Sequence, residues 1–283
     1  MWWPGRRVPE RITRHPPGGT LRIASLTAAL FAGAAVLSLT VLSPTGSSAA
    51  TTSATTAEDG CPVREYAMGI RYQQSAHAAA AQLQSWSIAK DRLRKAIADH
   101  HSDRDLAVVT DLDETVLDNS PLLARDLEAC HTYTTWDTWS DWEVKGHPTL
   151  TPGAADFFRY ADRHHVAIYY ISDRFEENKA STMATLRELG LPQVTSEQVL
   201  LYGPTKEQRR QVAAADHDVV LLLGDSLPDF HDAFDGATPD RQAELVARYA
   251  GHFGRDWVMF PNATYGSWRK SPLKAWDEPL QLP

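Results

Sequence analysis

The chain has 283 residues, of which 43% are hydrophobic and 23% charged, and its formal net charge is −8. The apolar content is ordinary for a folded globular protein. A net negative charge argues against nucleic acid or anionic membrane as the main partner, because both of these are negatively charged themselves. An anionic ligand must therefore be attracted by local positive charge.

Residues 1–50 have the features of a targeting segment. Arginines precede or open an apolar stretch at residues 23–42, and the small residues at 47–50 suit cleavage. We expect a cleaved signal peptide and a secreted protein with no stable membrane partner. The alternative is an uncleaved anchor formed by residues 23–42, because roughly 20 apolar residues can span a bilayer. Cleavage would remove five arginines and Glu10 and leave a net charge of −12.

A polar segment rich in small residues follows at 51–66, and this composition predicts a flexible linker. Cys61 and Cys130 are the two cysteines of the chain, and both lie in the part that would be exported. In an oxidising compartment we expect them to pair, which would tie the N-terminal segment to the region after the first strand. Two unpaired thiols are the alternative.

Hydrophobic periodicity predicts one long helix at residues 68–100, and strands and helices alternate after it. The predicted strands are at residues 106–110, 166–171, 199–202, 219–223 and 257–260, and the predicted helices are at residues 176–189, 206–215 and 241–252. This alternation predicts an α/β fold, in which a parallel sheet has helices on both faces. The polar span 120–152 interrupts the alternation, and we expect it to form a small, mainly helical insertion or cap.

The first predicted strand runs into the sequence D-L-D-E-T, so Asp111 and Asp113 lie at its end. Side chains alternate along an extended chain, so these two carboxylates point the same way and repel each other unless a cation or a proton intervenes. A calcium loop of the EF-hand type is excluded, because its sixth and twelfth positions need glycine and glutamate, where this chain has Val116 and Leu122. For this pair taken alone, a solvated turn is the alternative to a functional site.

Polar residues also follow the later strands. Ser172 comes after the second strand, and Lys206 opens a short helix. Asp225 and Asp229 come after the fully apolar strand at residues 219–223. Because α/β proteins bind ligands beyond the carboxyl ends of their parallel strands, we expect all of these side chains to converge at one edge of the sheet.

Taken in order, D-L-D-E-T, I-S-D-R, Lys206 and G-D-S-L-P-D-F resemble the four motifs of the haloacid dehalogenase (HAD) superfamily. More narrowly, the chain is similar to the class C (subfamily IIIB) acid phosphatases, which include lipoprotein 5′-nucleotidases and plant vegetative storage proteins. The strings Y-Q-Q-S-A, W-x-x-W and F-P-N-A-T-Y-G-S-W support this resemblance. It implies a Rossmann-like HAD domain at residues 67–283, with the cap at about 120–152.

The resemblance also implies a Mg²⁺-dependent enzyme that hydrolyses phosphate monoesters through an aspartyl-phosphate, and the targeting segment predicts that this enzyme is exported. Asp111 would be the nucleophile, and Asp113 would protonate the leaving group and then activate water. Neighbouring carboxylates would raise the pKa of Asp113, which would suit it to hold that proton. The implied metal ligands are Asp111, Asp225 and the backbone carbonyl of Asp113, with Asp229 as a ligand or a partner of one, and the implied phosphate contacts are Ser172 and Lys206.

The substrate is less closely defined. Trp136, Trp139 and Tyr265 are candidates for an aromatic substrate wall, as is Trp142, and packing of the cap is the alternative role for the tryptophans. The chain could be a general phosphatase, or a narrower 5′-nucleotidase or metabolite phosphatase. It could also be a non-catalytic storage or binding protein on the same fold, although retention of the motif residues argues against that function.

Overall fold

Five parallel strands form the central sheet of the structure, a computed structural model that describes residues 61, 63–132 and 135–275. In sheet order they are β5 (Val199–Leu200), β4 (Ala167–Ile171), β1 (Leu106–Thr110), β6 (Asp218–Gly224) and β7 (Trp257–Met259). Every neighbouring pair in this sheet is parallel. The predicted α/β fold is therefore confirmed, and the ends of each strand lie within two residues of the predicted ones.

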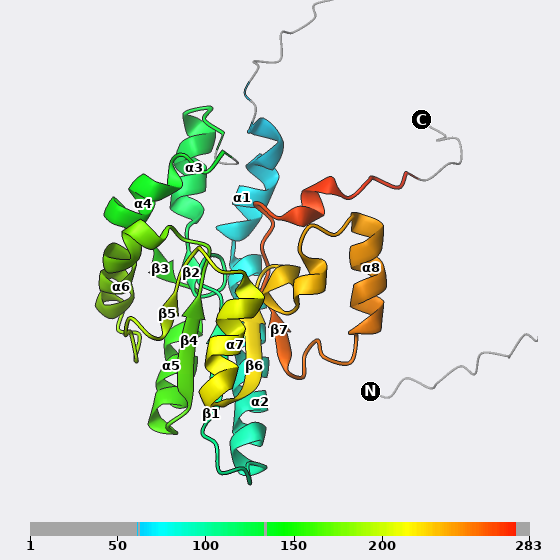
Figure 1. The fold of residues 1–283 in the computed structure, drawn as a ribbon. Coiled ribbons are helices and arrows are strands. Elements are labelled where there is room, and N and C mark those ends of the chain that lie inside the picture. The colour runs from blue at the N-terminus through cyan, green and yellow to red at the C-terminus, as the bar shows by residue number, and fades with distance from the viewer. Residues whose placement is uncertain (1–60, 62, 133–134, 276–283) are drawn as a thin grey trace, which may run out of the picture. The chain divides into compact units, whose positions relative to one another are not determined.

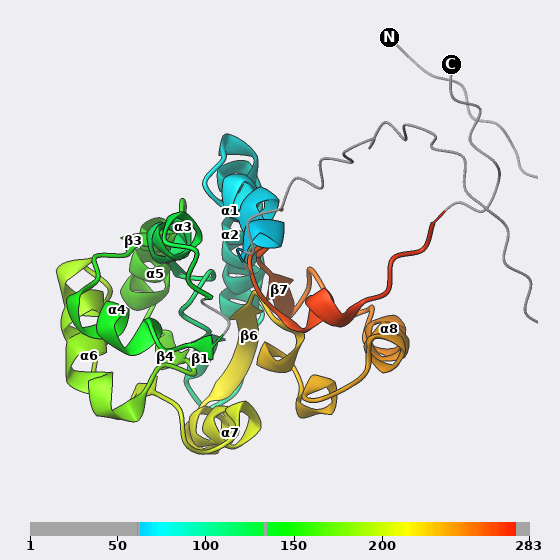
Figure 2. The same ribbon diagram turned by 90° about the horizontal axis from the view of Figure 1, so that it is seen from above.

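The alternation of side chains along the strands separates two cores. Val108 of β1 packs in the larger core, which also contains residues of α2 (Ala76–Ala98) and α5 (Ala154–Arg163). Its neighbour Val109 packs on the opposite face, in the core that contains α7 (Lys206–Asp216). Figures 1 and 2 show α7 on one side of the sheet and α2 with α5 on the other. Helices therefore cover both faces, as a parallel sheet requires.

The helix predicted at residues 68–100 is divided into two helices, α1 (Ala67–Gln73) and α2. Ser75 causes the break, because its backbone is extended and its hydroxyl accepts a hydrogen bond from the first turn of α2. The break allows α1 to pack tightly on the loop after β7. A Cβ atom at Gly69 would come within 1.9 Å of the carbonyl oxygen of Ala263, so this contact requires glycine.

The span 120–152 forms a small cap above the ends of the strands in Figure 1. Its elements are α3 (Ser120–Glu128), α4 (Trp139–Lys145) and the short strand β3 (Thr149–Leu150), which pairs antiparallel with β2 (Leu117–Asp118). Buried residues of the cap pack together with buried residues of the N-terminal segment, and this cluster consists of Val63, Ile70, Leu122, Leu123 and Trp139.

The N-terminal segment is also fastened to the cap covalently, because Cys61 and Cys130 form a disulfide. Val63 is fully buried, and Arg64–Tyr66 forms a 3-10 helix. The last residues of the expected linker at 51–66 are thus part of the fold, because Val63 packs into the apolar cluster of the cap. The rest of that linker, and the expected signal peptide or anchor, lie outside the described residues.

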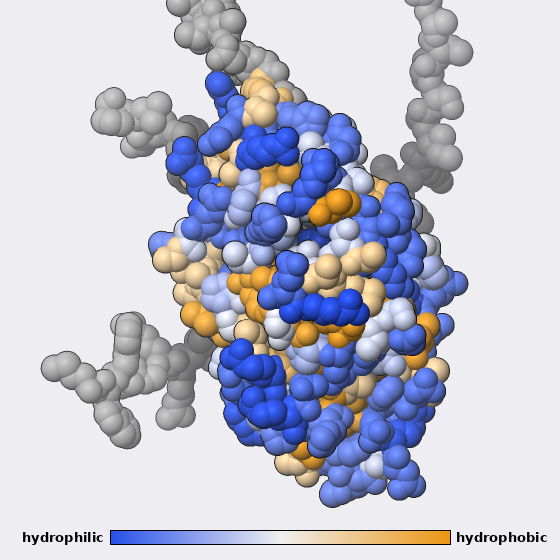
Figure 3. All heavy atoms as spheres, turned by 90° about the vertical axis from the view of Figure 1, so that its left-hand side faces the viewer, coloured by the Kyte–Doolittle hydropathy of each residue, from blue (hydrophilic) through white to orange (hydrophobic). Residues whose placement is uncertain are grey.

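Two further helices lie at the sides of the sheet. After the 3-10 turn Glu176–Asn178, α6 (Lys179–Glu188) packs against the larger core, and α8 (Pro239–Arg248) packs beside β7. The face on the α6 side shows hydrophobic residues in small separate groups among hydrophilic ones (Figure 3). Within the described part of the chain, no helix has the length and apolar character needed to cross a membrane.

Candidate active site

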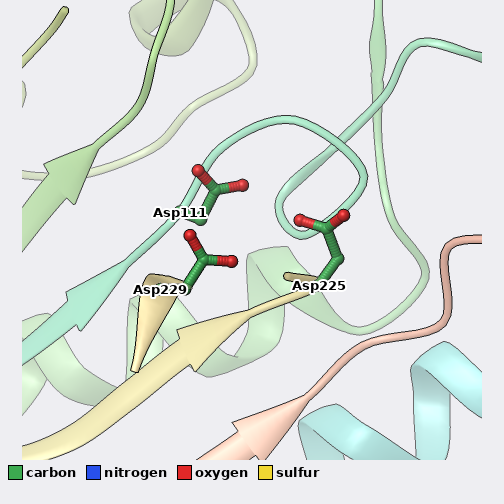
Figure 4. Close-up of side chains that lie close together, drawn as sticks. All are labelled: Asp111, Asp225 and Asp229. Carbon is green, nitrogen blue, oxygen red and sulfur yellow. The ribbon is translucent and has the colours of Figure 1, made fainter. Parts of the chain in front are cut away.

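Three carboxylates meet beyond the carboxyl ends of β1 and β6 (Figure 4). They belong to Asp111, Asp225 and Asp229, and one oxygen from each lies within 4.8 Å of the others. Asp111 follows β1 directly, and its backbone N–H donates to the carbonyl oxygen of Leu223 at 2.8 Å. This bond continues the pairing of β1 with β6, which is how Asp111 and Asp225 come to lie side by side. The expected convergence at this sheet edge is present for these three aspartates.

Asp229 reaches the cluster from a short 3-10 helix, Leu227–Asp229. Its Oδ2 accepts a hydrogen bond from the backbone N–H of Ser226 at 2.8 Å, which closes the turn. A Cβ atom at Gly224 would come within 2.3 Å of the Asp229 side chain. Glycine at this position therefore allows the turn to fold back onto the end of β6.

Lys206 brings a positive charge into the cluster. Its Nζ donates to Asp111 Oδ1 at 2.7 Å and to Asp229 Oδ1 at 2.5 Å, and its side chain is 15% exposed. The residue opens α7, whose start is held by a capping box in which Thr205 and Gln208 exchange side-chain to backbone hydrogen bonds. This box anchors a lysine whose preceding loop, L-Y-G-P-T, offers little support by itself.

Two arginines of α7 hold the neighbouring loops, and sequence reasoning missed both. Arg209 donates to the carbonyl oxygen of Ser172 and to Asp173 Oδ1, both at 2.5 Å, so it offsets the acidic residue after Ser172. Arg210 donates to two backbone carbonyl oxygens in the turn that carries Asp229. The available signal was the string K-E-Q-R-R, because residues three and four apart lie on one face of a helix.

The carboxylate of Asp113 lies among a separate set of donors. Arg174 donates from Nη2 to Oδ1 at 2.8 Å and from Nε to both oxygens, at 3.0 and 3.2 Å. Ser172 Oγ donates to Oδ2 at 3.0 Å, and Asn119 Nδ2 donates to Oδ1 at 2.9 Å. The hydroxyl of Ser172, predicted to contact phosphate, thus donates to Asp113 here. Sequence reasoning assigned no role to Arg174 or Asn119.

The expected raised pKa of Asp113 is wrong for this structure. Burial by itself raises the pKa, but the charge of Arg174 and the hydrogen bonds from Arg174, Ser172 and Asn119 outweigh burial and lower it. The sequence shows the neighbouring carboxylates, whereas the guanidinium that opposes them comes from the end of another strand. Asp113 is therefore stabilised in its ionised form when no ligand is bound.

Two members of the three-carboxylate cluster, Asp111 and Asp225, have raised pKa values instead. Burial raises the pKa of Asp111 well above its usual value; Lys206 opposes this rise, while Asp229 and Asp225 add to it. Burial and the charge of Asp229 raise the pKa of Asp225 to about 7. A divalent cation among these oxygens would stabilise their ionised forms, and carboxylate oxygens are the ligands that such hard cations prefer. The donor set therefore fits a divalent metal.

Asp225 is also held by two side chains that sequence reasoning did not assign to the site. Asn262 Nδ2 donates to Asp225 Oδ2 at 2.7 Å, and Thr115 Oγ1 donates to Oδ1 at 3.2 Å. The amide of Asn262 is oriented by Thr264, whose backbone N–H and hydroxyl both donate to Asn262 Oδ1. The F-P-N-A-T-Y string thus contributes to the position of a candidate metal ligand.

The aromatic candidates Trp136, Trp139 and Tyr265 do come together, with ring centroids 5.4 to 5.7 Å apart. Trp136 is 44% exposed, whereas Trp139 is 5% exposed and packs inside the cap. The hydroxyl of Tyr265 donates to Oε2 of the buried Glu114, in the loop after β1. Trp136 and Tyr265 thus remain candidates for the substrate wall, while Trp139 has the packing role that was its alternative.

A family model described as "HAD superfamily, subfamily IIIB (Acid phosphatase)" matches residues 30–268. Among solved structures, the chain is similar to the class C acid phosphatase from Bacillus anthracis. That match has 36% sequence identity and a TM-score of 0.69, and it covers 72% of this chain and 86% of that one. The structure of the class C acid phosphatase from Bacillus anthracis with tungstate bound is also similar, with 34% identity, coverage of 75% and 92%, and a TM-score of 0.69.

Proposed function

The chain belongs to the acid phosphatases of HAD subfamily IIIB, which are phosphomonoesterases, and we propose that it acts through an aspartyl-phosphate on Asp111 with Mg²⁺ as cofactor. The position of Asp111 carries this proposal. Its buried carboxylate lies at the strand end, 2.7 Å from Lys206 Nζ and beside the carboxylates of Asp225 and Asp229. A nucleophile, a counter-charge and a candidate metal site thus occupy one place.

The proposed reaction has two steps. In the first, a carboxylate oxygen of Asp111 bonds to phosphorus, the bond from phosphorus to the leaving oxygen breaks, and Asp113 gives that oxygen a proton. In the second, Asp113 takes a proton from water, the water oxygen bonds to phosphorus, and the bond to Asp111 breaks. Both carboxyl groups return to their starting states, and inorganic phosphate is released.

The remaining residues of the site would bind the cation and stabilise the negative charge of the phosphoryl group. Mg²⁺ would be held by Asp111, Asp225 and the backbone carbonyl of Asp113. Asp229 would be a further ligand or would hold one of these ligands in place. When bound, the cation offsets the negative charge shared by the phosphoryl group and the carboxylates. Lys206 and Ser172 are the proposed contacts to phosphoryl oxygens. A phosphoryl group bound beside Asp113 would raise the pKa of this residue by charge repulsion, which would prepare it to carry a proton.

Phosphate monoesters whose leaving group carries an aromatic ring are the proposed substrates, either as an aryl group or as the base of a nucleotide. The exposed Trp136 and the adjacent Tyr265 support this choice, because their rings can pack against a flat leaving group. Tungstate is a tetrahedral oxyanion like phosphate, and its presence in a similar enzyme supports an oxyanion site here. Whether the enzyme is a general phosphatase or a narrow 5′-nucleotidase depends on the leaving group it prefers.

We also propose that the enzyme is secreted after cleavage of residues 1–50, with anchoring by residues 23–42 as the alternative. The disulfide between Cys61 and Cys130 supports export, because disulfides persist in oxidising compartments. Mass determination of the protein from culture medium and from membranes would separate the two. A soluble extracellular form that begins near residue 51 is the expected result, whereas an intact membrane-bound chain would favour the anchor.

Release of inorganic phosphate by the purified enzyme tests the reaction. The substrates are p-nitrophenyl phosphate and a panel of 5′- and 3′-nucleotides, with Mg²⁺ or with chelator. We expect release to need Mg²⁺ and to fall by roughly 10⁴-fold or more in Asp111→Asn, in a variant that thermal unfolding shows to be folded at the assay temperature. Equal activity of the variant would contradict the mechanism, and the ranking of the panel decides between phosphatase and nucleotidase. A folded, Mg²⁺-loaded enzyme without activity on any substrate would favour the storage or binding role.

A further inference from the structure

Asn119 is fully buried between the loop after β1 and the cap, directly before α3. Its Nδ2 donates to Asp113 Oδ1 at 2.9 Å. Its Oδ1 accepts from Trp142 Nε1 at 2.8 Å and from Arg174 Nη2 at 3.2 Å. Its backbone N–H donates to Glu114 Oε1 at 3.1 Å. One side chain therefore connects the cap helix α4 with the proposed proton donor.

The orientation of the Asn119 amide is determined by chemistry. An indole N–H and a guanidinium N–H can only donate, so the atom that faces Trp142 and Arg174 must be the amide oxygen. The amide nitrogen must then face Asp113, to which it can only donate. Trp142, a residue of the cap, thus helps to decide which group is presented to the carboxylate.

Helix α4 also holds the segment that carries Arg174, the other donor to Asp113 Oδ1. Glu143, which follows Trp142, is 3% exposed and accepts from the backbone N–H of Phe175 at 3.1 Å and from Asn178 Nδ2 at 2.9 Å. Phe175 follows Arg174 in the chain. Two consecutive residues of α4 therefore hold Asn119 and the segment of Arg174, the two donors to Asp113 Oδ1.

The hydrogen bonds to Asp113 are unequal between its two oxygens. Oδ1 accepts from Asn119 and from both Nε and Nη2 of Arg174, whereas Oδ2 accepts from Ser172 and, at 3.2 Å, from Arg174 Nε. Oδ1 accepts three hydrogen bonds and Oδ2 two, and one of those two comes from Ser172, the proposed phosphate contact. Oδ2 is therefore the oxygen that would exchange a proton with the substrate. The direction of Oδ2 depends on how firmly Oδ1 is held.

We propose that Asn119 is a positioning residue for Asp113, and that helix α4, through Trp142, sets the orientation in which Asp113 meets the leaving-group oxygen. This inference rests on the proposed function, in which Asp113 protonates that oxygen. It gives the cap a part in the proton-transfer step. Trp142, expected as part of the aromatic wall, acts through its indole N–H instead.

The dependence of the rate on the leaving group tests the proposal. The substrates are 2,4-dinitrophenyl, 4-nitrophenyl and phenyl phosphate, whose leaving groups are increasingly basic and increasingly in need of a proton. The parameter is kcat/KM, because it reports the steps up to the departure of the leaving group. The variants are Asn119→Ala and Trp142→Phe. The phenylalanine keeps an aromatic ring but lacks the indole N–H. The control is Val144→Ala, because Val144 is an exposed residue of the same helix.

We expect the loss in kcat/KM to grow along the substrate series. For Asn119→Ala it should rise from less than about 3-fold with dinitrophenyl phosphate to about 100-fold with phenyl phosphate, within the range of general acid catalysis. For Trp142→Phe it should reach about 10-fold with phenyl phosphate, because Arg174 still orients the amide. Val144→Ala should match the unmodified enzyme on all three substrates.

A loss of equal size on all three substrates in folded Asn119→Ala and Trp142→Phe would overturn the proposal. Thermal unfolding establishes folding, and if Asn119→Ala does not fold, Trp142→Phe decides alone. Asp113→Asn in the same series separates the proposed acid role of Asp113 from the proposed positioning role of Asn119. If its loss grows with leaving-group basicity while the other variants show a flat loss, only the positioning role fails. If its own loss is flat, the acid role of Asp113 fails, and the positioning role fails with it.

Discussion

Replacing Lys206 with methionine should destabilise the metal-free enzyme by about 3–5 kcal/mol, the usual cost of removing one partner from a buried ion pair. The Lys206 Nζ lies 2.7 Å from Asp111 Oδ1 and 2.5 Å from Asp229 Oδ1, and the side chains of these aspartates are 7% and 3% exposed. Methionine keeps an unbranched apolar chain of similar length but loses the charge. Two buried carboxylates would then lack their cation.

Thermal unfolding at neutral pH with chelator measures this effect. In a domain of this size each kcal/mol shifts the midpoint by about 2–4 °C, so the expected fall is roughly 6–20 °C. Lys90→Met is the matched control, because Lys90 Nζ lies 2.5 Å from Asp156 Oδ2 with side chains 27% and 60% exposed. Surface pairs contribute about 0–1 kcal/mol, so the control midpoint should fall by less than about 4 °C. Equal shifts in the two variants would refute the reasoning that burial makes the Lys206 pairs strong.

Two further predictions concern the stability of the whole chain. Replacing Cys61 and Cys130 with serine should lower the free energy of unfolding by about 4 kcal/mol, since the cross-link closes a span of 69 residues in the unfolded chain. Denaturant unfolding measures this change, and an unaltered midpoint would contradict it. Without metal, stability should fall as pH rises from about 4 towards 7, because the pKa of Asp225 is raised from 3.8 to about 7 and the folded state therefore binds more protons than the unfolded state in this window. Mg²⁺ should reduce this fall, and metal-free stability that rises with pH across the same window would argue against the charged cluster.

The carboxylate cluster was predictable because its geometry follows from general rules. Asp111 and Asp225 each follow an apolar run that forms a strand, and parallel strands place their carboxyl ends at one edge of the sheet. The donors around Asp113 were not predictable in this way. Asn119 and Trp142 are 23 residues apart, and their hydrogen bond exists only because the cap folds back over the loop after β1.

Two predictions were wrong for the same reason: the single helix at residues 68–100 and the raised pKa of Asp113. Ser75 lies in a helical periodic pattern, and its capping role becomes visible only when α1 turns to pack on the loop at Ala263. The pKa of Asp113 was expected to rise because its neighbours in sequence are acidic. Arg174, 61 residues away, reverses that expectation by direct contact.

The sequence by itself determined the α/β fold, the bounds of the strands to within two residues, and the aspartates at the strand ends. These features depend on local periodicity and on short motifs. Only the tertiary structure decided which groups neutralise which charges. Lys206 pairs with Asp111 and Asp229, while Arg174 and Asn119 hold Asp113. Such contacts depend on distance in space, because electrostatic attraction weakens with that distance and hydrogen bonds need direct contact. The charge state of each of these carboxylates is therefore a property of the folded chain.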